Sequence, residues 1–417
     1  MISPRIPAGR PLAALLAACV LAGPSAALAL TLDDALRLAA SEAPSLQAQS
    51  ARVEAARNAA IPADALPDPK LVLGVQSLPI EKQNRWSLTD DSMTMQMYGL
   101  MQEVPNRAKR RARAEAASAG IDRAAAERHV ELLKVRAQTA QAWIAAHTVE
   151  RKLALFDELL AENRLLDRTV KAQIAGGQGQ AADAVAPRQE AALLAERRDE
   201  LEQQRAQARA SLRRWIGAAA DEPLDGHLPT WRADPHTYSG HLQSHPELLA
   251  YGPKLDEAKA RIDEAVAQKR PDWSWEVDYL RRGQQFGDMV NLKLTVDLPV
   301  FPGSRQNPTI AARHAEYDQL QAEREAMERE HAELLAFDLA ERQRLSRARQ
   351  RYQDSLLPLA REKVELSMAG YRSGKGGLND VLAARRELLE ARLKQIDLEG
   401  LEAIAGARLH FAYGNSL

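Results

Sequence analysis

The sequence predicts a mainly α-helical protein with a small membrane β part, in which a unit of helix, two strands and a long helical hairpin is duplicated. Three observations predict this fold class: an internal repeat, long helical runs without proline, and pairs of strands with alternating polarity. The 417 residues could hold two or three average domains, but a repeat of this kind can use the whole length as one unit.

The N-terminus has the organisation of a secretory signal. Two arginines precede the apolar run "LAALLAACVLAG", and a small-x-small cleavage site ends at Ala29. We therefore expect residues 1–29 to be a signal peptide. The only cysteine, Cys19, closes "LAAC", which resembles a lipobox, so lipidation of Cys19 is an alternative. With either cleavage the mature chain cannot form an internal disulfide.

The internal repeat has an offset of 197 residues. It matches "AQIAGGQGQAADAVAPRQE" with "AGYRSGKGGLNDVLAARRE", and so pairs Gly177 with Gly374 and Asp183 with Asp380. Upstream the offset becomes 202, and a hairpin loop between the two strands of each copy can absorb the change. The expected organisation is a first repeat at 30–217, a linker or equatorial segment at 218–242 and a second repeat at 243–417.

Each copy contains a very long helical run. Residues 106–174 contain no proline and only one glycine, and a continuous helix of this length spans about 100 Å at roughly 1.5 Å per residue. Such a length indicates a coiled coil or a span between membranes. The glycines at 176–179 and 374–377 break the runs and allow a tight turn into a return helix.

Four strands are expected, at about 70–77, 92–103, 272–280 and 289–300. Their alternation of apolar and polar residues is typical of transmembrane β-barrel strands, although a half-buried sheet in a soluble domain has the same period. Four strands cannot close a barrel, and open edges are not tolerated in lipid. A barrel would therefore require an oligomer, and the strand count allows a dimer or a trimer.

Four of the eight methionines lie in "DSMTMQMYGLMQEVP" (91–105). The 197-residue offset pairs Met93 with Val290 and Met95 with Leu292, which are on the apolar face of the corresponding strand. We therefore expect the methionines to lie on the apolar face of the first copy's strand, where they face lipid or pack against apolar neighbours. The alternative is a thioether ladder that binds a soft metal.

Several function classes find no support in the composition. Lys plus Arg number 56 against 57 Asp plus Glu, so no net charge favours nucleic acid as a partner. The nine histidines are scattered, and no nucleophile elbow or phosphate loop occurs. We expect no metal site, no cofactor and no enzymatic activity. A periplasmic adaptor or coiled-coil scaffold is a further alternative, but an adaptor should carry one helical hairpin flanked by β-rich modules.

Over its whole mature length, from "LTLDDALRLAASEAPSL" through both copies, the chain resembles the TolC family of outer-membrane efflux proteins. The resemblance implies a homotrimer with a twelve-stranded outer-membrane barrel, continued by an α-helical barrel that extends into the periplasm. It also implies two partners, a periplasmic adaptor (membrane fusion) protein and an inner-membrane pump of the RND type. Such a channel conducts solutes passively to the exterior.

The resemblance also implies a periplasmic gate. Tyr371 and Asp380 in "YRSGKGGLNDVL", with Asp183 in the first copy, match the aperture tyrosine and aspartates of the family. Two positions depart from the family pattern: Gly376 stands where the family has an arginine, and Ala383 stands where it has a further aspartate. We therefore expect a looser or differently wired aperture. Capping of the following helices would also explain both aspartates.

Within the family, "LPDPKLVLGVQSLP" and "MTMQMYGLMQEVP" resemble the heavy-metal branch, which serves cobalt–zinc–cadmium and copper–silver resistance pumps. The resemblance thus implies heavy-metal cations as the exported solute. Drug efflux and type I protein secretion use the same architecture and are the alternatives.

Overall fold

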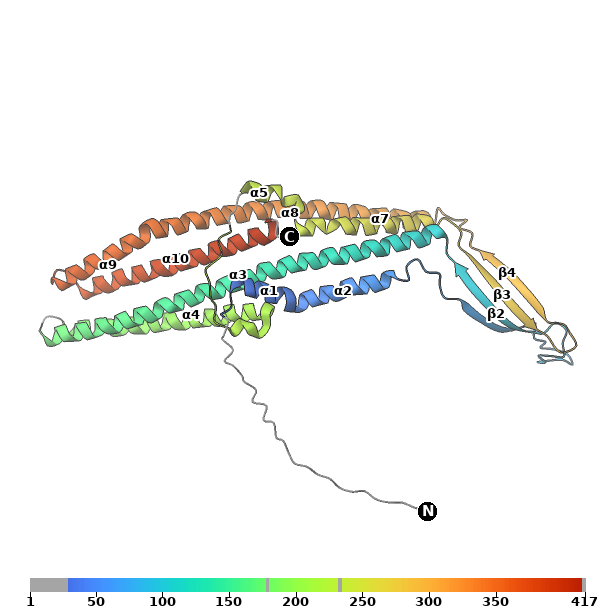
Figure 1. Cartoon of the computed structure of the whole chain (residues 1–417), viewed down its shortest axis with the longest axis horizontal. Coiled ribbons are helices and arrows are strands. Elements are labelled where there is room, and N and C mark those ends of the chain that lie inside the picture. The colour runs from blue at the N-terminus through green and yellow to red at the C-terminus, as the bar shows by residue number, and fades with distance from the viewer. Residues whose placement is uncertain (1–28, 178–179, 232–234, 415–417) are drawn as a thin grey trace, which may run out of the picture.

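The fold was obtained as a computed structural model, which describes residues 29–177, 180–231 and 235–414. The molecule is elongated, with a β-sheet at one end and the tips of two helical hairpins at the other (Figure 1). The predicted signal peptide, except for its last residue, and Cys19 lie outside the described residues. Within those residues, no helix is both long and apolar enough to cross a lipid bilayer.

The first half of the chain forms short helices, two strands and one long helical hairpin. Its elements are α1 Leu32–Glu42, α2 Pro44–Ala60, β1 Lys70–Gln76, β2 Met95–Val104, α3 Arg107–Ala175, the 3₁₀ helix η1 Ala181–Ala184, α4 Ala186–Ile216 and the 3₁₀ helix η2 Gly217–Asp221. Helix α3 is continuous over 69 residues. Asn106 begins it, because its side chain accepts a hydrogen bond from the backbone N–H of Lys109 at 2.9 Å.

The second half has the same order of strands and long helices. Its elements are α5 Pro235–Gly240, the 3₁₀ helix η3 Leu242–Ser244, α6 Pro246–Leu249, α7 Tyr251–Ala267, β3 Trp273–Arg281, β4 Met289–Val296, α8 Gln306–Arg351, the π-helical turn η4 Tyr352–Leu356, α9 Leu357–Arg372 and α10 Leu378–Tyr413. The long outward helix is thus interrupted where α3 is continuous. Pro358 explains the difference, since it has no N–H to donate to the preceding turn, and a π-helical turn accommodates this loss.

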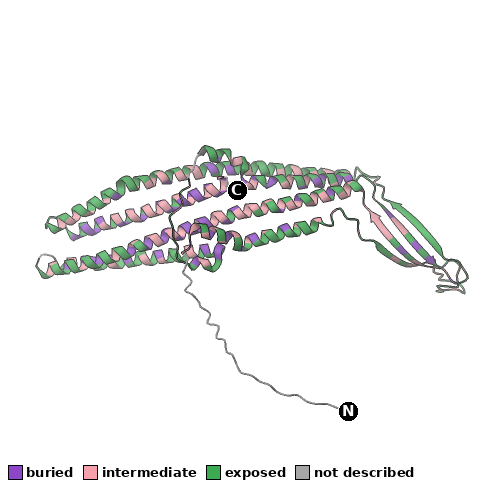
Figure 2. Cartoon of the chain, in the orientation of Figure 1, coloured by how far each residue is buried: buried purple, intermediate pink, exposed green. Residues whose placement is uncertain are grey.

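The strands of the described chain form one antiparallel sheet in the order β1-β2-β3-β4. The central pair, β2 with β3, joins the two halves of the chain. Cross-strand partners share a face, and one row consists of Leu71, Leu100, Val277 and Leu292. Leu71 is 72% exposed and Leu292 is 75% exposed. One chain alone therefore leaves an apolar sheet face uncovered, and β4 is exposed throughout (Figure 2).

The register shows that the predicted orientation of the methionines is wrong. Met101 pairs with Lys70 on one side and Glu276 on the other, so it lies on the polar face of the sheet. Met95 and Met97 share this face because they are an even number of residues away. Met93 precedes β2, which begins at Met95.

The error has a simple geometric cause. Leu100 precedes Pro105 by five residues, whereas Leu292 precedes Pro302 by ten. In the sheet, equivalent positions of the two strands therefore lie at different numbers of residues from the matched prolines, and the two numbers differ by an odd count. An odd shift reverses every side chain to the other face.

The largest buried cluster lies where α1, α3, α4 and the end of α10 meet, near the middle of the molecule (Figure 1). Trp143 of α3 is completely buried there, and its indole Nε1–H donates to the carbonyl oxygen of Leu30 at 3.1 Å. Further clusters follow the hairpins toward their tips. The core is therefore a row of helix–helix contacts that extends from the middle of the molecule to the hairpin tips.

Candidate functional site

The candidate gate lies at the hairpin tips, at the end of the molecule opposite the sheet (Figure 1). Matched glycines end the outward helices: Gly177 has φ of 75° and Gly374 has φ of 74°. These left-handed conformations favour glycine. The N–H of Gly177 donates to the carbonyl oxygen of Ile174, and that of Gly374 to Tyr371, at 3.0 Å in both copies. The turn geometry is thus duplicated together with the sequence.

The two predicted aspartates begin the return segments in equivalent ways. A carboxylate oxygen of Asp183 accepts from the backbone N–H of Gln180 at 3.2 Å, and one of Asp380 accepts from Gly377 at 3.1 Å. Both are helix-capping contacts. Asp380 is exposed and Asp183 is half-buried, so both carboxylates also retain access to solvent.

Tyr371 joins the two hairpins. It lies on α9, and its hydroxyl donates to the side-chain oxygen of Gln173 on α3 at 2.7 Å. Its ring packs against a buried cluster that includes Val170 and Leu378. Burial, together with the negative charge of Asp183, raises the pKa of Tyr371, so the hydroxyl keeps its proton at neutral pH. The structure therefore brings Tyr371 of the second hairpin and Asp183 of the first to the same end of the molecule.

Further along the hairpins, ion pairs that were not predicted from the sequence also join the first hairpin to the second. Arg386 of α10 pairs with Glu190 of α4 at 2.9 Å, and Glu190 is only 8% exposed. Arg151 of α3 pairs with Glu399 of α10 at 2.7 Å. A charged residue on a long helix gives no sequence signal of its partner on another hairpin. These pairs hold the first hairpin, α3–α4, against α10 of the second.

The two departures from the family pattern lie at the same end of the molecule. A Cβ atom added to Gly376 would be 3.3 Å from the backbone carbon of Gly370, which is tighter than an ordinary contact. The turn that follows α9 is therefore close-packed around a small residue. Ala383 is exposed on α10.

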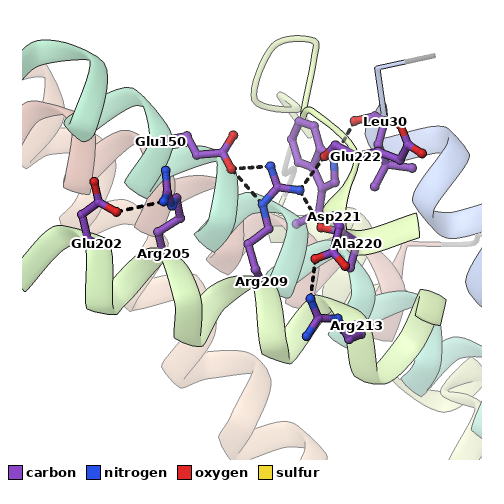
Figure 3. Close-up of polar contacts among 10 residues, drawn as sticks. Leu30, Glu150, Glu202, Arg205, Arg209, Arg213, Ala220, Asp221 and Glu222 are labelled. Carbon is purple, nitrogen blue, oxygen red and sulfur yellow. Dashed lines mark hydrogen bonds and ion pairs between the residues drawn. The ribbon is translucent and has the colours of Figure 1, made fainter. Parts of the chain in front are cut away.

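A second polar centre fixes the middle of the molecule (Figure 3). Arg209 of α4 forms a two-pronged ion pair with Glu150 of α3, and it also donates to the carbonyl oxygens of Ala220 and Glu222 at 2.6 and 2.5 Å. Its side chain is 16% exposed. One guanidinium thus joins α3, α4, η2 and the residue that follows η2.

The fold also gathers residues that the sequence left scattered. His245 and Glu247, at the start of α6, lie beside His331 of α8, and ligand-type atoms of all three are within 4.8 Å of one another. The spacing His-x-Glu was visible in the sequence, but His331 is 84 residues beyond Glu247 and nothing connected them. The two histidines, which are far apart in the sequence, therefore lie together with Glu247 in the fold.

Comparison with known proteins agrees with this architecture. The model of the family "Outer membrane efflux protein" matches residues 237–415. The cobalt-zinc-cadmium resistance protein CzcC of Cupriavidus metallidurans is 26% identical over 391 residues, which cover 89% of this chain and 87% of that protein.

Solved structures show the same fold. A crystal structure of a membrane protein from Pseudomonas aeruginosa matches with a TM-score of 0.79 and 21% identity, covering 92% of each chain. CusC, solved in a study of folding and transmembrane channel formation, matches with a TM-score of 0.77 and 17% identity, again over 92% of each chain. Together, the duplicated sequence, the fold and these likenesses make the chain similar to outer membrane efflux proteins: the family model matches its second half, and the relative and the solved structures match nearly its whole length.

Proposed function

We propose that the protein is the outer-membrane channel of a tripartite efflux system and acts as a homotrimer. The observation that best supports an oligomer is the uncovered apolar face of the described sheet together with its two free edges, β1 and β4, and the number of three copies is taken from the resemblance to the TolC family. Lipid can cover the apolar face but cannot satisfy the backbone groups of the edges.

Closure follows from the direction of the edge strands. Because neighbours alternate in direction, β1 and β4 are antiparallel. The β4 strand of one copy can therefore pair with β1 of the next copy in the antiparallel arrangement found throughout the sheet. Three copies then close a twelve-stranded barrel, an even number as in bacterial outer-membrane barrels.

The proposed mechanism is passive. A periplasmic adaptor and an inner-membrane pump of the RND type deliver the solute, and the trimer supplies a water-filled path to the exterior. The channel itself converts no energy. Its proposed gate is the ring of hairpin tips formed by three copies of Asp183, Tyr371 and Asp380.

The proposed solutes are heavy-metal cations. The relative CzcC is named for cobalt, zinc and cadmium resistance, and the likeness to it extends over 89% of this chain. A deletion strain should tolerate lower concentrations of these cations than its parent, and expression of the chain in trans should restore tolerance. Unchanged metal tolerance with loss of drug tolerance or of protein secretion would assign the channel to one of those systems instead.

The trimer is tested by electrophoresis of outer-membrane fractions. We expect a heat-modifiable band of three chains that converts to one chain on boiling. A soluble monomer in the periplasmic fraction would refute the proposed assembly.

A further inference from the structure

We infer that His245, Glu247 and His331 form a binding site for a divalent first-row transition-metal cation, such as zinc or cobalt. Two imidazoles and one carboxylate are a ligand set that suits these cations, and three protein ligands leave a fourth position for water. The cation would be resident in the protein, whatever solute the channel conducts.

The distances between the ligand atoms are compatible with a shared cation. Nε2 of His331 is 3.0 Å from a carboxylate oxygen of Glu247. Two tetrahedral ligands at the usual zinc distances are about 3.3 Å apart. The atom of His245 lies within 4.8 Å of both, so it needs to move by about 1.5 Å or less to complete the set. The rings of His245 and His331 already lie with their centroids 3.6 Å apart.

The charge states of the ligands favour a cation. Burial and the neighbouring His331 lower the pKa of His245 to about 4, so its imidazole is neutral and keeps a lone pair at neutral pH. The hydrogen bond from His331 lowers the pKa of Glu247, which is therefore ionised. At present the His245 lone pair accepts only a long hydrogen bond, 3.3 Å, from the backbone N–H of Glu247. A cation would replace this weak contact.

The surroundings also suit a metal ligand. Metal-bound histidines usually donate their second ring N–H to a fixed acceptor. The hydroxyl of Tyr413, at the end of α10, donates to the backbone carbonyl of His331 at 3.2 Å, and its oxygen is 3.5 Å from Nδ1 of the same residue. The oxygen of Tyr413 can therefore accept a hydrogen bond from Nδ1–H when Nε2 binds metal. The Glu247 side chain is 44% exposed, which leaves the ion a route from solvent.

The position of the site predicts what the cation does. His245 and Glu247 belong to the segment that enters the second repeat, whereas His331 lies in the long helix α8. Zinc binding would join this segment to α8 and to the end of α10. Because a ligand that binds only the folded protein stabilises it, the unfolding midpoint should rise with zinc concentration.

The test uses the full-length mature protein in detergent, without a histidine tag and after removal of metals with a chelator. Titration calorimetry with zinc should show one site per chain, and cobalt should give visible absorption bands typical of a tetrahedral site. His331→Ala should abolish this site, as should Glu247→Gln, which preserves the size of the side chain. The control is His314→Ala, which removes an exposed histidine from the same helix and should leave binding unchanged.

Further variants and outcomes decide the inference. Tyr413→Phe should weaken zinc binding by about tenfold, the lower end of the range for partners of metal ligands. Glu247→Gln decides the test if His331→Ala does not fold. The inference is overturned if the wild-type chain takes up no zinc, or if its one site persists in Glu247→Gln. Neither measurement depends on what the channel exports, so failure here would leave the proposed function intact.

Discussion

At the scale of single residues, the sheet shows how sharply the two faces differ. Neighbouring positions of β2 have opposite surroundings: Leu100 lies in a row with Leu71 and Val277, whereas Met101 lies between Lys70 and Glu276. Gly99 adds a close approach on the polar face, because a Cβ atom there would lie 2.0 Å from a carboxylate oxygen of Asp278. The methionines therefore pack on the charged side, where an acidic side chain passes directly over a glycine.

This assignment predicts opposite outcomes for two adjacent substitutions. Leu100→Arg places a charge on the apolar face and should cost about 2–4 kcal/mol if that face meets lipid near the bilayer midplane. Met101→Arg places the same charge beside Glu276 and should assemble normally. The measurement is the amount of heat-resistant oligomer in outer-membrane fractions. The reverse ranking of the two variants would show that the faces are exchanged.

At the scale of helices, Arg209 connects α4 with α3, with η2 and with the residue that follows η2, in a largely buried position (Figure 3). Arg209→Ala leaves the carboxylate of Glu150 and two carbonyl groups without this donor, and should lower the free energy of unfolding by about 2 kcal/mol. The neighbouring Arg205 supplies the control. It pairs with Glu202 on the surface of the same helix, and its removal should change stability by less than about 0.5 kcal/mol. Thermal unfolding followed by circular dichroism compares the two, and equal shifts would deny Arg209 a special role.

The same scale separates what the sequence could predict from what it could not. Long helices and glycine turns were predictable, because proline-free runs and positive-φ glycines are local properties. The face of β2 was predicted wrongly, because it depends on how many residues separate the sheet from Pro105, which the repeat does not fix. The contact of Tyr371 with Gln173 and the gathering of His245 with His331 join distant segments. Contacts between distant segments of this kind leave no periodic pattern in the sequence, so neither could be predicted.

At the scale of the whole molecule, the proposed opening of the channel requires the hairpins to separate at their tips. Each aspartate there both caps a helix and carries a charge, and two substitutions distinguish these roles. Asn keeps a side-chain oxygen that can accept the capping hydrogen bond, whereas Ala removes both cap and charge. If charge closes the aperture, Asp183→Asn combined with Asp380→Asn should raise single-channel conductance in planar bilayers as much as the double alanine variant. An increase in the alanine variant alone would assign the effect to loss of capping, and unchanged conductance in both would remove the aspartates from the gate.

Tyr371 tests the same opening through a neutral contact. Its hydroxyl is held by Gln173 of the other hairpin at 2.7 Å, while its ring is packed among apolar side chains. Tyr371→Phe removes the hydrogen bond, worth about 1 kcal/mol, and keeps the ring. Adding Arg386→Ala removes the ion pair with Glu190 further along the same pair of hairpins. If these contacts keep the tips together, conductance should rise in the single variant and rise further in the double variant.

The control is Lys363→Ala, which breaks an exposed pair with Glu387 inside the second hairpin and should leave conductance unchanged. If the control opens the channel as much as the double variant does, contacts between the hairpins are not what holds it closed.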